Sequence, residues 1–174
     1  YVIDDEAIRS LREISNNLSP HVLNDFGLAR GVQNFIDKSV AMHDVKIRFT
    51  TNLRSERYDT DIEVILYRVI CELINNSLKH AACTAVNLSL AQNGSELTLD
   101  YTDNGRGFNP QAMMDCGMGL SNIVSRVHSI NGHCNVEGAK GKGMHAAIRV
   151  NVRGEASAAA GARRRTAARR RKRR

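Results

Sequence analysis

The chain has 174 residues, 42% of them hydrophobic, so it is long enough to bury a real core and is not a disordered polymer. Its net charge of +7 belongs to the C-terminus, because residues 163–174 contain nine Lys or Arg and no acid, which leaves −2 for the remainder. The body therefore has no general nucleic-acid signature, and no apolar run is long enough to span a membrane.

The four cysteines are scattered and include no Cys-x-x-Cys pair, which favours a reduced, cytoplasmic setting over a disulfide framework. His80-x-x-Cys83 has the spacing of half a metal site, but no second half matches it, so metal binding by Cys or His is disfavoured. Because the chain begins at Tyr1, we expect a piece of a longer protein, and we leave open whether that parent is anchored to a membrane.

The N-terminal part predicts two helices followed by a strand. Residues 4–18 carry an apolar stripe at helical spacing, and this helix is expected to end before Pro20. A second helix is expected to open at Gly27 and to continue to Val40. Residues 45–49 alternate apolar and polar side chains, which is typical of a strand with one buried face.

A central helix is expected over residues 66–80, introduced by Thr60-Asp-Ile-Glu63, which has the spacing of a capping box. Glu72, Asn76 and Lys79 fall at steps of four and three, so they line one face, with His80 beside them. These side chains form either a solvent-exposed surface or one wall of a site for a metal-bound polyphosphate. A second face is apolar and is formed by Leu66, Val69, Ile70, Leu73 and Ile74.

A hairpin is predicted next, because two alternating runs near 86–90 and 97–101 flank the turn signal Asn93-Gly94. Residues 103–119 are rich in Gly, Asn and Asp and predict a long loop. A helix over 121–131 should follow and end at Gly132, and the body should finish with strands near 133–137 and 144–152.

Three glycine clusters follow the central helix: Asp103-Asn-Gly-Arg-Gly-Phe108 after a strand, Gly117-Met-Gly-Leu120 before a helix, and Gly141-Lys-Gly143 before the last strand. Each alone is more typical of an ordinary turn, since glycine is the default turn residue. Together, behind a helix that carries Glu, Asn and Lys, they are harder to explain as turns, because glycine also lets the backbone approach a ligand.

This arrangement suits a bound nucleotide. Backbone N–H groups from Gly117 to Leu120 would form an anion site at a helix N-terminus, and Asn76 offers Mg²⁺ an amide oxygen. Lys79 and His80 would face phosphate charge. Asp103 can accept a hydrogen bond from the exocyclic amine of adenine, with Gly105 and Gly107 leaving room for a flat base. P-loop, dinucleotide-binding and Gly-x-Ser-x-Gly motifs are absent.

The order of these boxes resembles the ATP-binding catalytic domain of bacterial sensor histidine kinases, a Bergerat-fold (GHKL) ATPase, and in particular the nitrate-sensor-like subfamily with a short ATP lid. Residues 66–81 resemble the N box, and the three glycine clusters resemble the three glycine boxes in order. Residues 18–28 resemble the segment that links the second helix of the dimerisation and phosphotransfer hairpin to the catalytic domain. The resemblance covers about residues 5–152.

The resemblance implies an α/β (α+β) two-layer sandwich, with a mixed sheet in one layer and helices on one face. ATP would lie between the layers, under the loop from Phe108 to Met118. Residues 1–26 would be a remnant of the hairpin plus a linker, residues 27–153 the ATP-binding domain, and residues 154–174 an Ala- and Arg-rich tail that we treat as an appendage.

The family's functional residues carry over onto the matching positions. Asn76 would hold Mg²⁺, and Glu72 would polarise water or support the metal, so these two are the predicted catalytic residues. Lys79 and His80 would contact the phosphates, and Asp103 would read adenine. The remaining nucleotide contacts are expected from Gly105, Gly107, Gly117, Gly119, Leu120 and Gly143.

The chain departs from the family in two places. Met144 stands where the third glycine box usually has a Thr that helps to bind adenine through water. The phosphoacceptor His of the subfamily sits on the first hairpin helix and is not found here, and His21, which follows Pro20 in a linker, is not expected to replace it.

We therefore expect the chain to bind Mg·ATP and hydrolyse it slowly without autophosphorylating. The parent is expected to be a homodimer that phosphorylates the hairpin of the same or the partner protomer and then a response regulator. Two alternatives stay open: another Bergerat-fold ATPase or anti-sigma-type serine kinase, and a non-catalytic interaction module with degenerate boxes and a tail that binds acidic partners.

Overall fold

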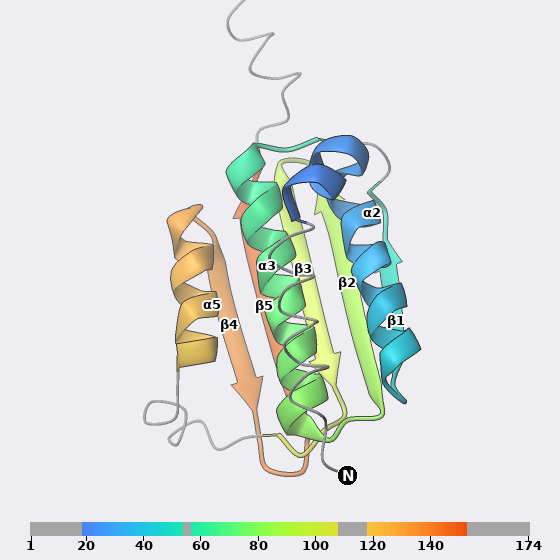
Figure 1. Cartoon of the computed structure of the whole chain (residues 1–174). Coiled ribbons are helices and arrows are strands. Elements are labelled where there is room, and N and C mark those ends of the chain that lie inside the picture. The colour runs from blue at the N-terminus through green and yellow to red at the C-terminus, as the bar shows by residue number, and fades with distance from the viewer. Residues whose placement is uncertain (1–18, 54–56, 108–117, 153–174) are drawn as a thin grey trace, which may run out of the picture.

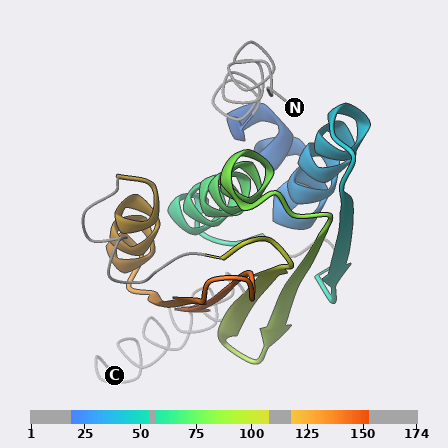
Figure 2. The same cartoon turned by 90° about the horizontal axis from the view of Figure 1, so that it is seen from below.

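The structure is a computed structural model, and it describes residues 19–53, 57–107 and 118–152. These residues form two layers, a five-stranded sheet and a set of helices that covers one face of it (Figures 1 and 2). The elements are α2 (Ser19–Met42), β1 (Lys46–Thr51), α3 (Thr60–Asn76), the π-helical turn η1 (Ser77–Ala81), β2 (Ala85–Asn93), β3 (Glu96–Asp103), α5 (Met118–Ser129), β4 (His133–Gly138) and β5 (Met144–Asn151).

The sheet is mixed, with the strand order β1-β2-β3-β5-β4. Only β1 and β2 run parallel, while β2, β3, β5 and β4 pair antiparallel in that order. In the helical layer, α3 lies between α2 and α5 (Figure 1). The predicted two-layer α/β sandwich with a mixed sheet is therefore confirmed.

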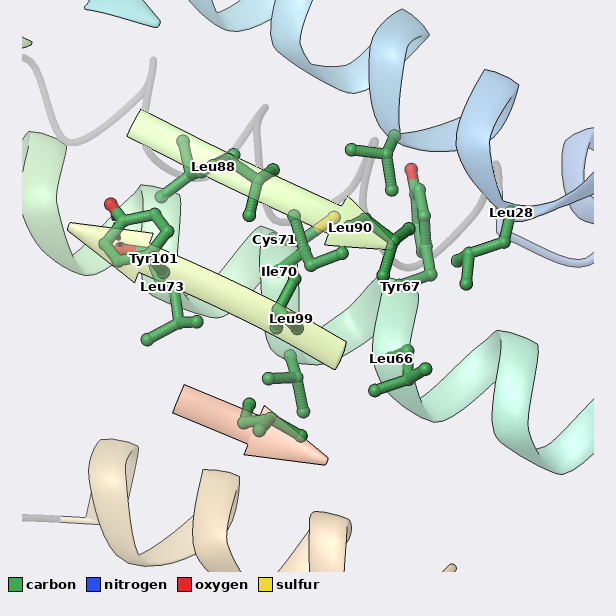
Figure 3. Close-up of a cluster of buried hydrophobic side chains, with 14 of the residues drawn as sticks. Leu28, Leu66, Tyr67, Ile70, Cys71, Leu73, Leu88, Leu90, Leu99 and Tyr101 are labelled. Atoms are coloured by element: carbon green, nitrogen blue, oxygen red, sulfur yellow. Dashed lines mark hydrogen bonds between the residues drawn. The ribbon is translucent and has the colours of Figure 1, made fainter. Parts of the chain in front are cut away.

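The core fills the space between the layers. Alternate residues of β2 and β3, including Leu88, Leu90, Leu99 and Tyr101, point from the sheet toward α3 (Figure 3). The helix side is the apolar stripe that its three- and four-residue spacing predicts, and every member of it is buried: Leu66, Val69, Ile70, Leu73 and Ile74. Burial of each such side chain contributes about 2 kcal/mol, so this interface fixes α3 on the sheet.

The predicted hairpin is confirmed, since β2 and β3 pair up to Asn93 and Glu96 and are joined by Gly94 and Ser95. The predicted strands near 133–137 and 144–152 are β4 and β5. The expected buried face of β1 is only partly formed, because Ile47 and Phe49 are half-buried on this edge strand.

The start of α2 corrects the expectation for Pro20. Residues 19–26 are helical rather than a linker, and Pro20 lies in the first turn, where its missing N–H removes no intrahelical bond. Gly27 does separate two helical segments, as predicted, because it has φ 77° and ψ 175° inside α2. The helix expected over 4–18 lies outside the described residues. No helix in the described ranges is long and apolar enough to cross a bilayer.

The predicted capping box at Thr60 is wrong. Asp59 is the N-cap of α3, and its side chain accepts from the backbone N–H of Asp61 at 3.0 Å. Glu63 therefore stands one position too late to complete the box. Its carboxylate instead accepts from the backbone N–H of Tyr58 at 3.0 Å and from both Nε and Nη2 of Arg57, each at 3.1 Å.

Candidate functional site

Those of the predicted site residues that the structure describes lie toward one end of the molecule. There α3 runs into η1, β3 ends, β5 begins and α5 starts (Figure 1; Figure 2 looks onto this end). Asp103 pairs in register with Met144, the backbone N–H of Arg106 donates to Ala81 at 2.7 Å, and that of Gly141 donates to Arg106 at 2.6 Å. Backbone hydrogen bonds therefore join the N box to the first glycine box, and the first box to the third.

Asp103 is the central polar group of this end. Its carboxylate is only 7% exposed and accepts at both oxygens: Oδ1 from the backbone N–H of Gly105 at 2.8 Å and Oδ2 from the hydroxyl of Ser77 at 2.6 Å. A buried carboxylate needs such donors, because desolvating an unpaired charge is costly. The carboxylate is therefore fixed in direction.

A buried tyrosine extends this network. The hydroxyl of Tyr101 lies 2.7 Å from Ser77 Oγ and 3.2 Å from the carbonyl oxygen of Leu73, and the side chain points at α3 (Figure 3). Burial raises the pKa of Tyr101 well above its ordinary value; the Ser77 hydrogen bond opposes this and the nearby charge of Asp103 adds to it. The hydroxyl therefore keeps its proton and acts as a donor.

Three of the predicted glycines are required by close approach of the protein to itself. A Cβ on Gly105 would overlap Ala81, one on Gly107 would overlap the carbonyl oxygen of Ala139, and one on Gly143 would overlap the carbonyl oxygen of Asp103. Gly107 and Gly143 also have positive φ, 66° and 74°. These three glycines are therefore required by the packing of the domain itself, and their contact with a nucleotide stays a prediction from the sequence.

The polar row on the central helix is present but is not continuous α-helix. Glu72 and Asn76 are half-buried and lie one turn apart on α3. Lys79 and His80, half-buried and exposed respectively, lie in η1, where the chain takes a wider π turn that ends at Ala82 with φ 48°. Single π turns of this kind are frequently found at functional sites.

The second glycine box is only partly described. Helix α5 begins at Met118, three residues before the predicted Ser121, so Gly119 and Leu120 lie in its first turn rather than in a loop. The free backbone N–H groups of a helix belong to its first four residues, so this shift keeps them at the predicted anion site. Leu120 is half-buried against the core. Gly117 and most of the expected lid lie outside the described residues.

Sequence reasoning missed three residues at this end. Ser77 donates a hydrogen bond to Asp103, and Tyr101 donates one to Ser77. The only sequence signal for either residue is that Tyr101 lies two residues before Asp103, on the same face of β3. The third is Asn75, whose buried Oδ1 has no hydrogen-bond partner among the described residues. Such an atom stands out because buried polar groups are nearly always paired.

His43, which is followed by Asp44, is a second histidine that does not take the place of the phosphoacceptor. It lies beyond the end of α2 rather than on a preceding hairpin helix, and its Nδ1 is 3.1 Å from the carbonyl oxygen of Ser39. His43 is therefore occupied in ending α2. No group of three or more His, Cys, Asp or Glu side chains within the described ranges could hold a metal ion.

The mixed sheet, the helical layer and the glycine-bounded carboxylate at one end define a Bergerat-type ATPase domain. Residues 61–154 match the family described as histidine kinase-, DNA gyrase B- and HSP90-like ATPase, and the chain belongs to this family. Membership implies ATP binding.

Similar proteins point to the histidine kinase branch. The chain is 30% identical over 149 residues to sensor histidine kinase ComP of Bacillus subtilis (strain 168), covering 84% of this chain and 19% of ComP. Among solved structures, the histidine kinase domain of a blue-light activated kinase from Erythrobacter litoralis EL346 has a TM-score of 0.66 at 15% identity, covering 83% of this chain and 75% of that one. The mycobacterial sensor histidine kinase MprB has a TM-score of 0.55 at 18% identity, covering 71% and 93%.

The structural likenesses support the fold, and the ComP match supports the branch. This chain spans about a fifth of the length of ComP. The placement within a nitrate-sensor-like subfamily stays a prediction from the sequence.

Proposed function

We propose that this chain binds Mg·ATP and donates the γ-phosphoryl group to a histidine of a sensor histidine kinase. The acceptor would be supplied by the dimerisation and phosphotransfer hairpin of the same or a partner protomer, and the group would pass on to a response regulator. Family membership supports the ATP-binding step, and the match to ComP supports the kinase setting.

The observation that carries the proposal is the fixed carboxylate of Asp103. It accepts hydrogen bonds from Gly105 and Ser77 and is left with lone pairs but no proton to offer. Such a group recognises an amine, and the 6-amino group of adenine is the donor that an ATP site would present. Gly143 packs against the backbone of Asp103 and carries no Cβ, so no side chain from this residue lies beside Oδ1.

Magnesium fits the residues present. Asn76 is half-buried at the end of α3, and no hydrogen bond joins its amide to another described side chain or backbone group. An amide oxygen is a hard ligand of the kind Mg²⁺ accepts, with water and phosphate oxygens completing its six positions. Bound there, Mg²⁺ would neutralise charge on the phosphates, while Lys79 and His80 would contact their oxygens.

The chemistry needs little else from this chain. A neutral nitrogen of the acceptor imidazole attacks the γ-phosphorus, a P–N bond forms, and the bond from that phosphorus to the β–γ bridging oxygen breaks, releasing ADP. The protein's contribution is to position the phosphates and stabilise their charge. Glu72, one turn from Asn76, would orient water at the metal and would support the slow hydrolysis expected when no acceptor is present.

Titration calorimetry with ATP tests the binding step. Asp103→Ala should weaken ATP binding at least tenfold, because one charge-assisted hydrogen bond is lost. The matched control is Asp100→Ala, which removes an exposed carboxylate of the same strand and should leave the affinity unchanged. Asn76→Ala should make ATP affinity the same with Mg²⁺ and with EDTA. Equal ATP binding by wild type and Asp103→Ala would overturn the assignment of Asp103.

The transfer step needs a longer chain that carries the hairpin. Incubated with labelled ATP, it should acquire acid-labile, base-stable phosphate, as a phosphohistidine does. Acid-stable phosphate would instead favour the serine-kinase alternative. No binding of ATP at all would favour an interaction module with degenerate boxes.

A further inference from the structure

Asp103 is held by a relay of two hydroxyls that begins in the core. Tyr101, Ser77 and Asp103 form a line in which successive oxygen atoms are 2.7 and 2.6 Å apart. All three residues are buried, and they come from both layers, since Ser77 belongs to η1 while the other two belong to β3. We infer that Tyr101 and Ser77 are positioning residues that set the preference of the site for a 6-amino over a 6-oxo purine.

The direction of the protons in this relay follows from the charge at its end. A hydrogen bond to a carboxylate is stronger than one between hydroxyls, so the Ser77 proton points to Asp103 Oδ2. Ser77 Oγ then offers only lone pairs to Tyr101, and the phenolic proton fills the 2.7 Å gap rather than the longer 3.2 Å contact to Leu73. Each hydroxyl thus donates toward Asp103, and none accepts from it.

Fixing the carboxylate in this way has opposite effects on two ligands. An adenine amine donates to a carboxylate that cannot turn away, so the hydrogen bond forms at little entropic cost. A 6-oxo purine such as inosine presents lone pairs to the same oxygens and is repelled. Without the relay, Asp103 is held at Oδ1 by Gly105 alone and can rotate. The hydrogen bond to the adenine amine is then weakened, and so is the repulsion of a 6-oxo group.

This inference rests on the proposed function, because it takes Asp103 to be the group that meets the base. It goes further by assigning discrimination to two residues that would not touch the nucleotide. A purely structural role for Tyr101 predicts something different: loss of its hydroxyl would change the stability of the fold but would weaken ATP and ITP equally.

The test measures the affinity of the 174-residue chain for Mg·ATP and Mg·ITP by calorimetry. Tyr101→Phe keeps the ring in the core and removes only the hydroxyl. It should lower the ratio of ATP to ITP affinity about fivefold, and Ser77→Ala should lower it about tenfold. The matched control is Tyr58→Phe, which removes another buried tyrosine hydroxyl, bonded to Gln92 Oε1 at 2.6 Å, and should leave the ratio unchanged.

The possible outcomes distinguish a failure of the inferred relay from a failure of the proposed function. If Asp103→Ala weakens ATP binding but Tyr101→Phe shows the same ATP-to-ITP ratio as Tyr58→Phe, the relay is overturned and the proposed function stands. If Asp103→Ala binds both nucleotides as the wild type does, Asp103 does not bind the base, and the inference about the relay is overturned as well. Should Ser77→Ala be poorly folded, Tyr101→Phe still decides the matter, because its shape is retained.

Discussion

Glu63 shows how one buried carboxylate ties three segments together. It is 2% exposed and accepts three hydrogen bonds, two from Arg57 and one from the backbone of Tyr58. Arg57 also donates through Nη1 to the carbonyl oxygen of Asn24 at 2.7 Å. The first segment of α2 is thereby connected to the first turn of α3, the helix that carries the proposed metal ligand.

Removing either partner of this pair should have unequal effects. Arg57→Leu leaves a buried carboxylate with fewer donors and should lower the free energy of unfolding by about 2 kcal/mol, discounted because the Arg57 side chain is 40% exposed. Glu63→Gln keeps an acceptor for Tyr58 and should cost about 1 kcal/mol.

Urea unfolding measures both effects. Asp100→Asn is the control, because its pair with His145 is exposed and should contribute less than about 0.5 kcal/mol. A smaller loss for Arg57→Leu than for Asp100→Asn would show that the buried pair does not stabilise the domain.

Gly27 governs the shape of α2. Its φ of 77° and ψ of 175° lie in a region that is nearly restricted to glycine, so it turns the chain between two helical segments. Gly27→Ala should therefore cost about 1–3 kcal/mol of stability by thermal or urea unfolding. The control is Asn34→Ala in the exposed middle of the same helix, which should be neutral or slightly stabilising. A Gly27→Ala protein as stable as the control would contradict the strained geometry.

The same elements show what could be predicted from the sequence. The apolar stripe of α3 and the alternation in β2 and β3 repeat over several turns or pleats, so they were predictable, and with them the sandwich. The N-cap was missed because Asp59 and Thr60 are both good caps, and the sequence does not show that Glu63 binds Arg57 instead of closing a capping box. The π turn after Asn76 was missed because one extra residue in a turn leaves no periodic trace.

At the site, local spacing predicted the order of the boxes but not the contacts between them. Asp103 could be identified from its own cluster. Its hydroxyl partner could not, since Ser77 is 26 residues away and meets it only when η1 packs on the sheet. Tyr101 looked like one more apolar position of β3, because a period-two pattern says that a side chain is buried but not what its hydroxyl contacts.

The whole domain should lose stability at alkaline pH through two buried tyrosines. Burial is the main cause that raises the pKa of both Tyr67 and Tyr101 above the ordinary value of about 10. Because the raised pKa belongs to the folded state, the unfolded chain releases these protons first. The stability that the neutral tyrosines provide is complete below pH ~10 and is lost as the pH rises above that value.

The expected slope distinguishes this cause from general alkaline unfolding. Above pH ~10, each tyrosine should lower the free energy of unfolding by about 1.4 kcal/mol per pH unit. The free energy of unfolding, measured with urea from pH 8 to 11, should therefore fall less steeply with pH for Tyr67→Phe and for Tyr101→Phe than for the wild type. It should fall least steeply for the double variant, whatever the stabilities of these proteins at pH 8. An equally steep fall in the double variant would assign the loss to other groups. Because Tyr67 faces α2 and Tyr101 faces the site, the two single variants separate the contributions of the two tyrosines to this pH dependence.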